Sequence, residues 1–128
     1  MPTRYLLDTV VLIEYLRGSD RAAEFLEQLD GELMISAITV AELSSGARGS
    51  DEMDALDQFV LAFEVVPVDE QLARAGGQLR KEYHTSYGVG LANALIAASA
   101  EEREAKLVTF NRRHYPMVEN LTVPYERR

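Results

Sequence analysis

The sequence contains no cysteine, and its apolar runs are short. The lack of cysteine excludes disulfides, zinc–thiolate and iron–sulfur sites and a cysteine nucleophile. No apolar run approaches the roughly 18–20 residues that cross a bilayer, so no membrane partner is expected. Asp8 and then Glu14 interrupt the N-terminal apolar stretch, which argues against a secretory signal. A Gly-rich phosphate loop is also absent, which disfavours nucleotide-binding enzymes. We therefore expect a cytoplasmic protein.

Length and composition are those of one globular domain. The chain has 128 residues, of which 47% are hydrophobic and 27% charged, so it can bury a core without cross-links. We expect residues 1–128 to form a single domain. Residues 1–64 carry 13 acidic and 4 basic side chains, whereas residues 65–128 carry 8 and 9. Because nucleic-acid-coating proteins are usually basic, contact with a polyanion would depend on the second half and on bound cations.

Short apolar runs alternate with helical patterns along the chain. The apolar runs predict strands at residues 4–8, 33–35, 65–66 and 106–110, with a fifth at 121–123. The helical patterns cover residues 9–16, 21–29, 36–46, 51–63, 69–83 and 91–104, and a turn or short helix is expected at 111–115. Strands separated by helices predict an α/β fold, in which helices cover both faces of a parallel sheet.

Four polar residues lie at strand ends or in the helices that follow: Asp8, Glu42, Asn93 and Asn111. Ligands of open parallel sheets bind at this edge, outside the carboxyl ends of the strands. Each residue also has a local explanation. Asp8 can cap the next helix, and Glu42 can form a capping box with Thr39. Asn93 can bond a free backbone N–H at a helix start, and Asn111 can form an Asx-turn.

Together, these residues suggest a metal site. Clustered carboxylates repel one another unless a cation neutralises them, and oxygen ligands favour Mg²⁺ or Mn²⁺ over zinc or copper. The candidate site residues are Asp8, Glu42, Asn93 and Asn111, and the Thr109 hydroxyl could be offered to the same site. A divalent ion facing a phosphodiester can activate water and stabilise the leaving oxygen.

Four stretches of the chain also resemble a known family. They are residues 5–13 (YLLDTVVLI), 35–43 (ISAITVAEL), 90–100 (GLANALIAASA) and 107–115 (LVTFNRRHY). In this order and spacing they resemble a PIN-domain ribonuclease, specifically a VapC-type toxin of a type II toxin–antitoxin pair. The resemblance covers nearly the whole chain. The joint match is specific, whereas any one stretch alone is not.

The resemblance implies a three-layer α/β/α sandwich around a central parallel sheet of four to five strands. It also implies a Mg²⁺- or Mn²⁺-dependent endoribonuclease that leaves 5′-phosphate and 3′-hydroxyl ends. Its partners would be RNA, a cognate antitoxin protein that blocks the site, and a second toxin copy, within a higher toxin–antitoxin assembly. Asp8 and Glu42 match two family carboxylates, and Asn111 matches a position that holds Asp or Asn.

Position 93 departs from the family, which usually has an aspartate ligand there. Asn93 removes one negative charge, either as an inactivating substitution or as the natural residue of a weak or inactive member. The departure keeps a second hypothesis open, a non-catalytic PIN-like module that binds RNA or protein through a degraded site. Arg112 and Arg113 are candidate contacts to the RNA backbone, with Thr109 as a weaker one, although solvated arginines are equally expected.

Apolar residues on two predicted helices offer a surface for the antitoxin. Residues 9–17 and 51–63 each carry an apolar face at helical spacing. Such a face suits a partner segment that packs into a groove, although packing onto the protein's own core explains the same pattern.

Overall fold

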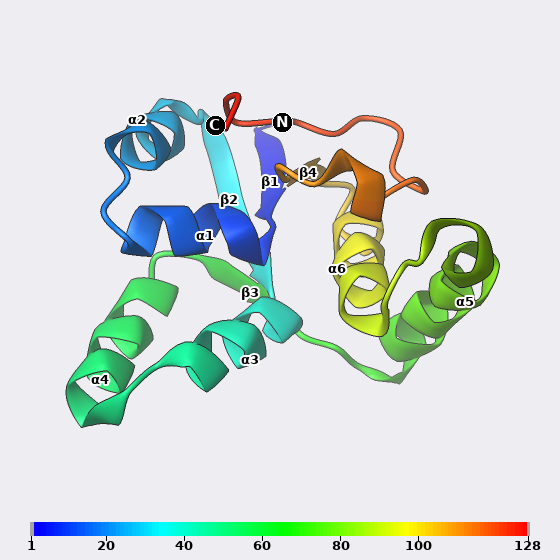
Figure 1. The fold of residues 1–128 in the computed structure, drawn as a ribbon, viewed down its shortest axis with the longest axis horizontal. Coiled ribbons are helices and arrows are strands. Elements are labelled where there is room, and N and C mark those ends of the chain that lie inside the picture. Colours follow the sequence, from blue (N-terminus) through cyan, green and yellow to red (C-terminus); the bar gives the residue numbers. More distant parts are fainter. Residues whose placement is uncertain (1, 128) are drawn as a thin grey trace.

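A parallel sheet of four strands forms the middle layer of the protein (Figure 1). The computed structural model describes residues 2–127, so the expected domain ends at 1 and 128 lie outside the described residues. The strands are β1 (Thr3–Leu7), β2 (Gly31–Ser36), β3 (Glu64–Val66) and β4 (Lys106–Val108). They lie in the order β3-β2-β1-β4, and every neighbouring pair is parallel.

Two helices connect each strand to the next along the chain. They are α1 (Thr9–Leu16), α2 (Asp20–Gln28), α3 (Ala37–Gly46), α4 (Gly49–Val60), α5 (Glu70–Tyr87) and α6 (Leu91–Glu102), followed by the short 3₁₀ helix η1 (Arg112–His114). In Figure 1, α1, α2 and α4 lie on one side of the sheet and α5 and α6 on the other. The predicted three-layer α/β/α sandwich is confirmed.

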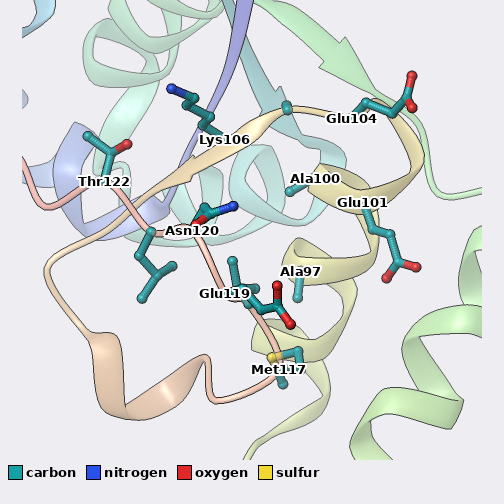
Figure 2. Close-up of a pocket in the computed structure, with 12 residues that line it drawn as sticks. Ala97, Ala100, Glu101, Glu104, Lys106, Met117, Glu119, Asn120 and Thr122 are labelled. Carbon is teal, nitrogen blue, oxygen red and sulfur yellow. The ribbon is translucent and has the colours of Figure 1, made fainter.

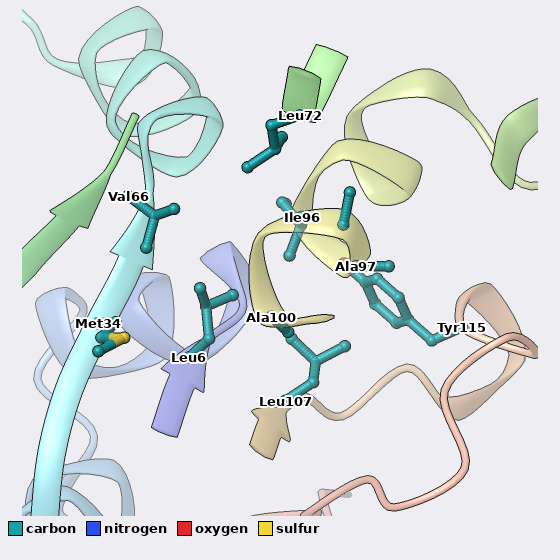
Figure 3. Packing of buried hydrophobic residues seen from close by; sticks show 10 residues of the cluster. Leu6, Met34, Val66, Leu72, Ile96, Ala97, Ala100, Leu107 and Tyr115 are labelled. Carbon is teal, nitrogen blue, oxygen red and sulfur yellow. The ribbon is translucent and has the colours of Figure 1, made fainter. Parts of the chain in front are cut away.

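The core has two halves because neighbouring strand residues point to opposite faces of a sheet. Leu6 belongs to the cluster beneath α5 and α6, whereas Leu7 belongs to the cluster beneath α1, α3 and α4. The same division separates Leu107 from Val108. Figure 3 shows the first cluster, which also contains Tyr115 at 1% exposure. Both faces are apolar, as expected for a buried parallel sheet.

The described strands and helices differ from the prediction mainly at their ends. The expected fifth strand at 121–123 is a single parallel bridge between Thr122 and Val108, so the sheet keeps four strands. Helix α5 extends to Tyr87, where Gly88 closes it at φ 68°, a left-handed value that suits glycine. Within residues 2–127, no helix is both long and apolar enough to cross a membrane.

The strand order creates a switch point between β1 and β4. From β1 the chain proceeds to β2 and β3 on one side, and then returns to place β4 on the other side of β1. The carboxyl ends of β1 and β4 therefore flank the crevice where open parallel sheets bind ligands. Asp8 directly follows β1, and Thr109 directly follows β4.

Close packing of α5 on α6 leads to a stability prediction. A β-carbon at Gly76 would meet the Leu95 side chain and lie 3.2 Å from Leu95 Cα, whereas one at Gly77 would meet nothing within 4 Å. We expect Gly76→Val to lower the free energy of unfolding by about 1–3 kcal/mol through overpacking. Chemical denaturation measures the effect. Gly77→Val on the same helix is the control, and an equal loss in both variants would contradict this packing.

Candidate metal centre

Asp8 is a buried carboxylate with three hydrogen-bond donors. Its side chain is 4% exposed, and Oδ1 accepts from the backbone N–H of Thr9 at 2.9 Å, which caps α1. The Thr109 hydroxyl donates to Oδ2 at 2.6 Å, and Tyr115 Oη lies 3.0 Å from Oδ1. Asp8 thus caps the helix, as its local explanation predicts, and also lies at the switch point, whereas its role as a metal ligand stays a prediction.

Glu42 lies on α3 with an exposed side chain and is joined to Asp8 through Thr9. The Thr9 hydroxyl donates to Glu42 Oε1 at 2.6 Å and lies 2.9 Å from the Thr39 hydroxyl. Since the single Thr9 proton goes to the carboxylate, Thr39 is the donor to Thr9. Ser36 caps α3, so Thr39 lies inside the helix. Glu42 accepts from Thr9 across two elements, and the capping box with Thr39, which was its alternative local explanation, is not formed.

Asn93 reaches the same cluster from the first turn of α6. Its Oδ1 lies 3.2 Å from Tyr115 Oη, the hydroxyl that also contacts Asp8. The N-cap of α6 is Gly90, which forms no side-chain cap hydrogen bond. The Asn93 side chain therefore contacts a distant segment of the chain. The alternative, a local hydrogen bond to the backbone at the helix start, is not the contact that it makes.

Tyr115 connects Asp8 to Asn93 from the segment that follows η1. Its ring belongs to the core cluster beneath α6 and is 1% exposed. Burial raises the pKa of the Tyr115 phenol far above its ordinary value, and the nearby charges of Asp8 and Glu42 and the hydrogen bond to Asp8 act in the same direction. The phenol therefore keeps its proton and remains a hydrogen-bond donor.

Asn111 and the two arginines lie at the edge of this cluster. The Asn111 backbone N–H donates to the Thr109 hydroxyl at 3.1 Å, which orients that hydroxyl toward Asp8. Asn111 precedes η1 without a side-chain cap hydrogen bond, and Arg112 and Arg113 are exposed on η1. The structure thus brings Asp8, Glu42 and Asn93 into one hydrogen-bonded cluster and places Asn111 beside it.

Sequence reasoning missed three members of the cluster: Thr9, Thr39 and Tyr115. The signal for Thr9 was its position directly after Asp8, before an apolar run. The sequence around Thr39 indicates only a helix cap, yet its side chain is completely buried and lies within the cluster. No sequence pattern separates Tyr115 from an ordinary core aromatic residue. It does pack in the core, and its hydroxyl lies within the site.

The donor set suits a hard divalent cation. A carboxylate has about four lone-pair positions, and Asp8 uses three, which leaves one on Oδ2, whereas Glu42 uses one. Neither carboxylate forms an ion pair within residues 2–127. In these residues no three Asp, Glu, His or Cys side chains group as a metal site, and the third oxygen group of this cluster is the Asn93 amide. Two unpaired carboxylates with free oxygen positions are appropriate ligands for Mg²⁺ or Mn²⁺.

Two hollows differ in their relation to this cluster. One, of about 770 Å³, lies between the end of α6, the start of β4 and residues 117–122 (Figure 2). It contains none of the site residues. The second, of about 530 Å³, is a groove between α1, α3 and α4 whose lining includes Glu42, Ile13, Leu16 and Leu43. Of the site residues, only Glu42 lines this groove, whose wall combines apolar side chains with Arg17, Arg48 and Glu52.

Comparisons with known proteins agree with this geometry. Residues 5–119 match the PIN domain family. Ribonuclease VapC10 of Mycobacterium tuberculosis is 37% identical over 123 residues, which cover 94% of this chain and 92% of that protein. Ribonuclease VapC19 of the same organism is 39% identical over 124 residues, which cover 94% of this chain and 98% of that protein.

Solved structures give the same result. A toxin–antitoxin complex from Klebsiella pneumoniae superposes with a TM-score of 0.83 at 27% identity, covering 95% of this chain and 98% of that chain. VapBC2 from Rickettsia felis, bound to a DNA fragment from its promoter, gives 0.77 at 28% identity, covering 94% and 96%. The chain belongs to the PIN domain family, and the resemblance to VapC-type proteins is confirmed.

The hydroxyl of Thr109 provides a direct test of how Asp8 is held. Thr109→Val keeps the shape but removes the donor to Asp8 and the acceptor of the Asn111 N–H. We expect the free energy of unfolding to fall by about 1–3 kcal/mol, because two buried polar groups lose their partner. Urea denaturation without added metal measures the loss. Thr109→Ser, which keeps the hydroxyl, should lose clearly less, and equal losses would contradict the assignment.

Proposed function

We propose that this chain is a metal-dependent endoribonuclease that acts as the toxin of a toxin–antitoxin pair in the cytoplasm. The observation that carries the proposal is a pair of carboxylates in a PIN-family fold, Asp8 at the switch point and Glu42 joined to it through Thr9, neither of which forms an ion pair within residues 2–127. Relatives that match nearly the whole chain are named ribonucleases. We take residues 1–128 as one PIN domain.

Each side chain has a role that follows from its contacts. Asp8 Oδ2, Glu42 and the Asn93 amide oxygen would hold Mg²⁺ or Mn²⁺, with Asp8 fixed by its three donors. When bound, such a cation supplies an activated water and neutralises charge on a phosphodiester. Thr9 holds Glu42 in place, and Thr109 holds Asp8, a supporting role that suits its complete burial better than contact with RNA.

The edge of the site offers groups for the substrate. Arg112 and Arg113 are exposed beside Asn111, where guanidinium groups can bind RNA phosphates. The Asn111 side chain is half-buried between these arginines and Thr109, in a position to orient a water molecule or a phosphate oxygen. These cations also compensate, at the site, for the acidic character of the first half of the chain.

A cognate antitoxin is the expected protein partner. Solved relatives include a toxin–antitoxin complex and several VapBC structures. The groove would receive an antitoxin segment, because Leu16 in its lining is 47% exposed and Glu42 lines the same groove. A toxin homodimer within a larger toxin–antitoxin assembly completes the proposal.

A non-catalytic PIN-like module that binds RNA or protein is the second candidate. Asn93 favours it, because the amide leaves the cluster with two carboxylates and lowers its attraction for a divalent cation. The two candidate functions differ in one expected outcome. A carboxylate at position 93 should create RNA cleavage in a ribonuclease but not in a binding module.

Asn93→Asp is the test that separates the two candidates. The added carboxylate should increase Mn²⁺-dependent RNA cleavage by about 10–100-fold, the range that metal-site changes typically produce. Cleavage of a fluorescent RNA without antitoxin, together with growth after induction, measures the effect.

The matched control for this test is the double variant Asn93→Asp/Asp8→Asn, which should show no cleavage because it loses a ligand. If Asn93→Asp cleaves no more RNA than the original chain and neither arrests growth, the binding module is the better description.

The groove leads to a separate prediction about the partner. Leu16→Glu places a charge in the groove and should weaken binding of the cognate antitoxin by about tenfold or more, at the level of a hot-spot residue. Isothermal titration with the purified antitoxin measures the affinity. Leu61→Glu is the control, since Leu61 is 76% exposed and does not line the groove. Unchanged affinity in Leu16→Glu would place the antitoxin elsewhere.

A further inference from the structure

The Tyr115 hydroxyl has two oxygen neighbours but only one proton. Asp8 Oδ1 lies 3.0 Å from Tyr115 Oη, and the Asn93 amide oxygen lies 3.2 Å from it. Both neighbours are acceptors in this arrangement, so a single phenol proton leaves one short contact between two oxygens without a hydrogen between them. The charged carboxylate is the stronger acceptor and takes the proton.

A rotation of the Asn93 amide by 180° removes this conflict. Nδ2 then takes the position of Oδ1 and can donate to the free lone pair of Tyr115 Oη. We propose that Asn93 donates to Tyr115 and Tyr115 donates to Asp8, so that Tyr115 is a positioning residue for the Asp8 carboxylate. In this relay each of the three groups has a partner, and Asn93 Oδ1 is released from the phenol and available as an oxygen ligand.

The burial of Tyr115 supports this role. The ring is 1% exposed and lies within the core cluster beside α6 (Figure 3), so no bulk water competes for its hydroxyl. A tyrosine hydroxyl ordinarily carries its proton at neutral pH, as a donor to Asp8 must. Thr39 and Thr9 form a similar relay toward Glu42, so each carboxylate is held by a hydroxyl that receives a second hydrogen bond.

The relay also gives residue 93 a reason to be an amide. An aspartate at this position has no N–H, so two carboxylates would compete for the one Tyr115 proton. Asn93 is therefore matched to a tyrosine at position 115, and the two positions must be considered together. The metal-binding consequence rests on the proposed function, whereas the hydrogen-bond direction does not.

The direction of the hydrogen bond can be measured in the metal-free protein. The chain has three asparagines, so ¹⁵N-asparagine labelling gives three side-chain amide signals, and the loss of one in Asn93→Asp assigns Asn93. One Asn93 amide proton should exchange with water at least about tenfold more slowly than those of the exposed Asn120. In Tyr115→Phe, which keeps the ring, this protection should disappear. Exchange in the original chain as fast as that of Asn120 would overturn the relay.

Metal affinity tests the positioning role. Tyr115→Phe should weaken Mn²⁺ binding by about 10–100-fold, as expected for a group that orients a ligand. Thr109→Val, which removes the other hydroxyl on Asp8, should also weaken it. In the Asn93→Asp background, Thr109→Val should weaken Mn²⁺ binding by the same factor as in the original chain, because Thr109 does not contact residue 93. In the same background, Tyr115→Phe should reduce Mn²⁺ affinity clearly less than in the original chain. The reason is that the Tyr115 phenol in the Asn93→Asp variant is already shared between two carboxylates.

The outcomes separate this inference from the proposed function. If Tyr115→Phe weakens Mn²⁺ binding by the same factor in the original chain and in the Asn93→Asp variant, the coupling of the two positions is overturned. If neither the original chain nor Asn93→Asp binds Mn²⁺, the proposed metal site fails, and amide exchange alone then decides the relay.

Discussion

The burial of the Asp8 carboxylate is the constraint on which the site depends. A buried carboxylate is strongly unfavourable unless hydrogen bonds replace its water. Asp8 obtains them from the start of α1, from the residue after β4 and from Tyr115 near the end of the chain. Segments separated by about a hundred residues must meet for this set to form. The same bonds therefore stabilise the fold and fix one wall of the site.

The second constraint is the negative charge that the fold leaves without a counterion. Ion pairs in the described residues lie on the surface, for example between Arg4 and Glu32, and do not reach Asp8 or Glu42. Hydroxyl donors orient the two carboxylates but do not neutralise them. A cation, whether a divalent metal or a basic group of a protein partner, would satisfy this charge. Asn93 reduces the demand by one charge.

Much of the fold could be predicted from the sequence, because periodicity reports which faces are buried. The strand and helix order and the three layers follow from alternating patterns. The 121–123 segment was harder, since a three-residue apolar run does not distinguish a strand from a single bridge such as that of Thr122. At the site, the sequence predicted that Asp8, Glu42 and Asn93 lie close together, and the structure joins them in one hydrogen-bonded cluster, while their metal binding stays a prediction. The role of Tyr115 was not predictable, because no local pattern indicates that a core aromatic directs its hydroxyl toward a carboxylate 107 positions away.

The central claim is that Asp8 and Glu42 together bind a divalent cation. The most direct test is an anomalous difference map from crystals of this chain soaked in Mn²⁺. The account predicts a peak within coordination distance of Asp8 Oδ2 and a Glu42 oxygen, and no such peak in crystals of Asp8→Asn. A peak elsewhere on the molecule, or none under conditions that saturate a binding site, would contradict it.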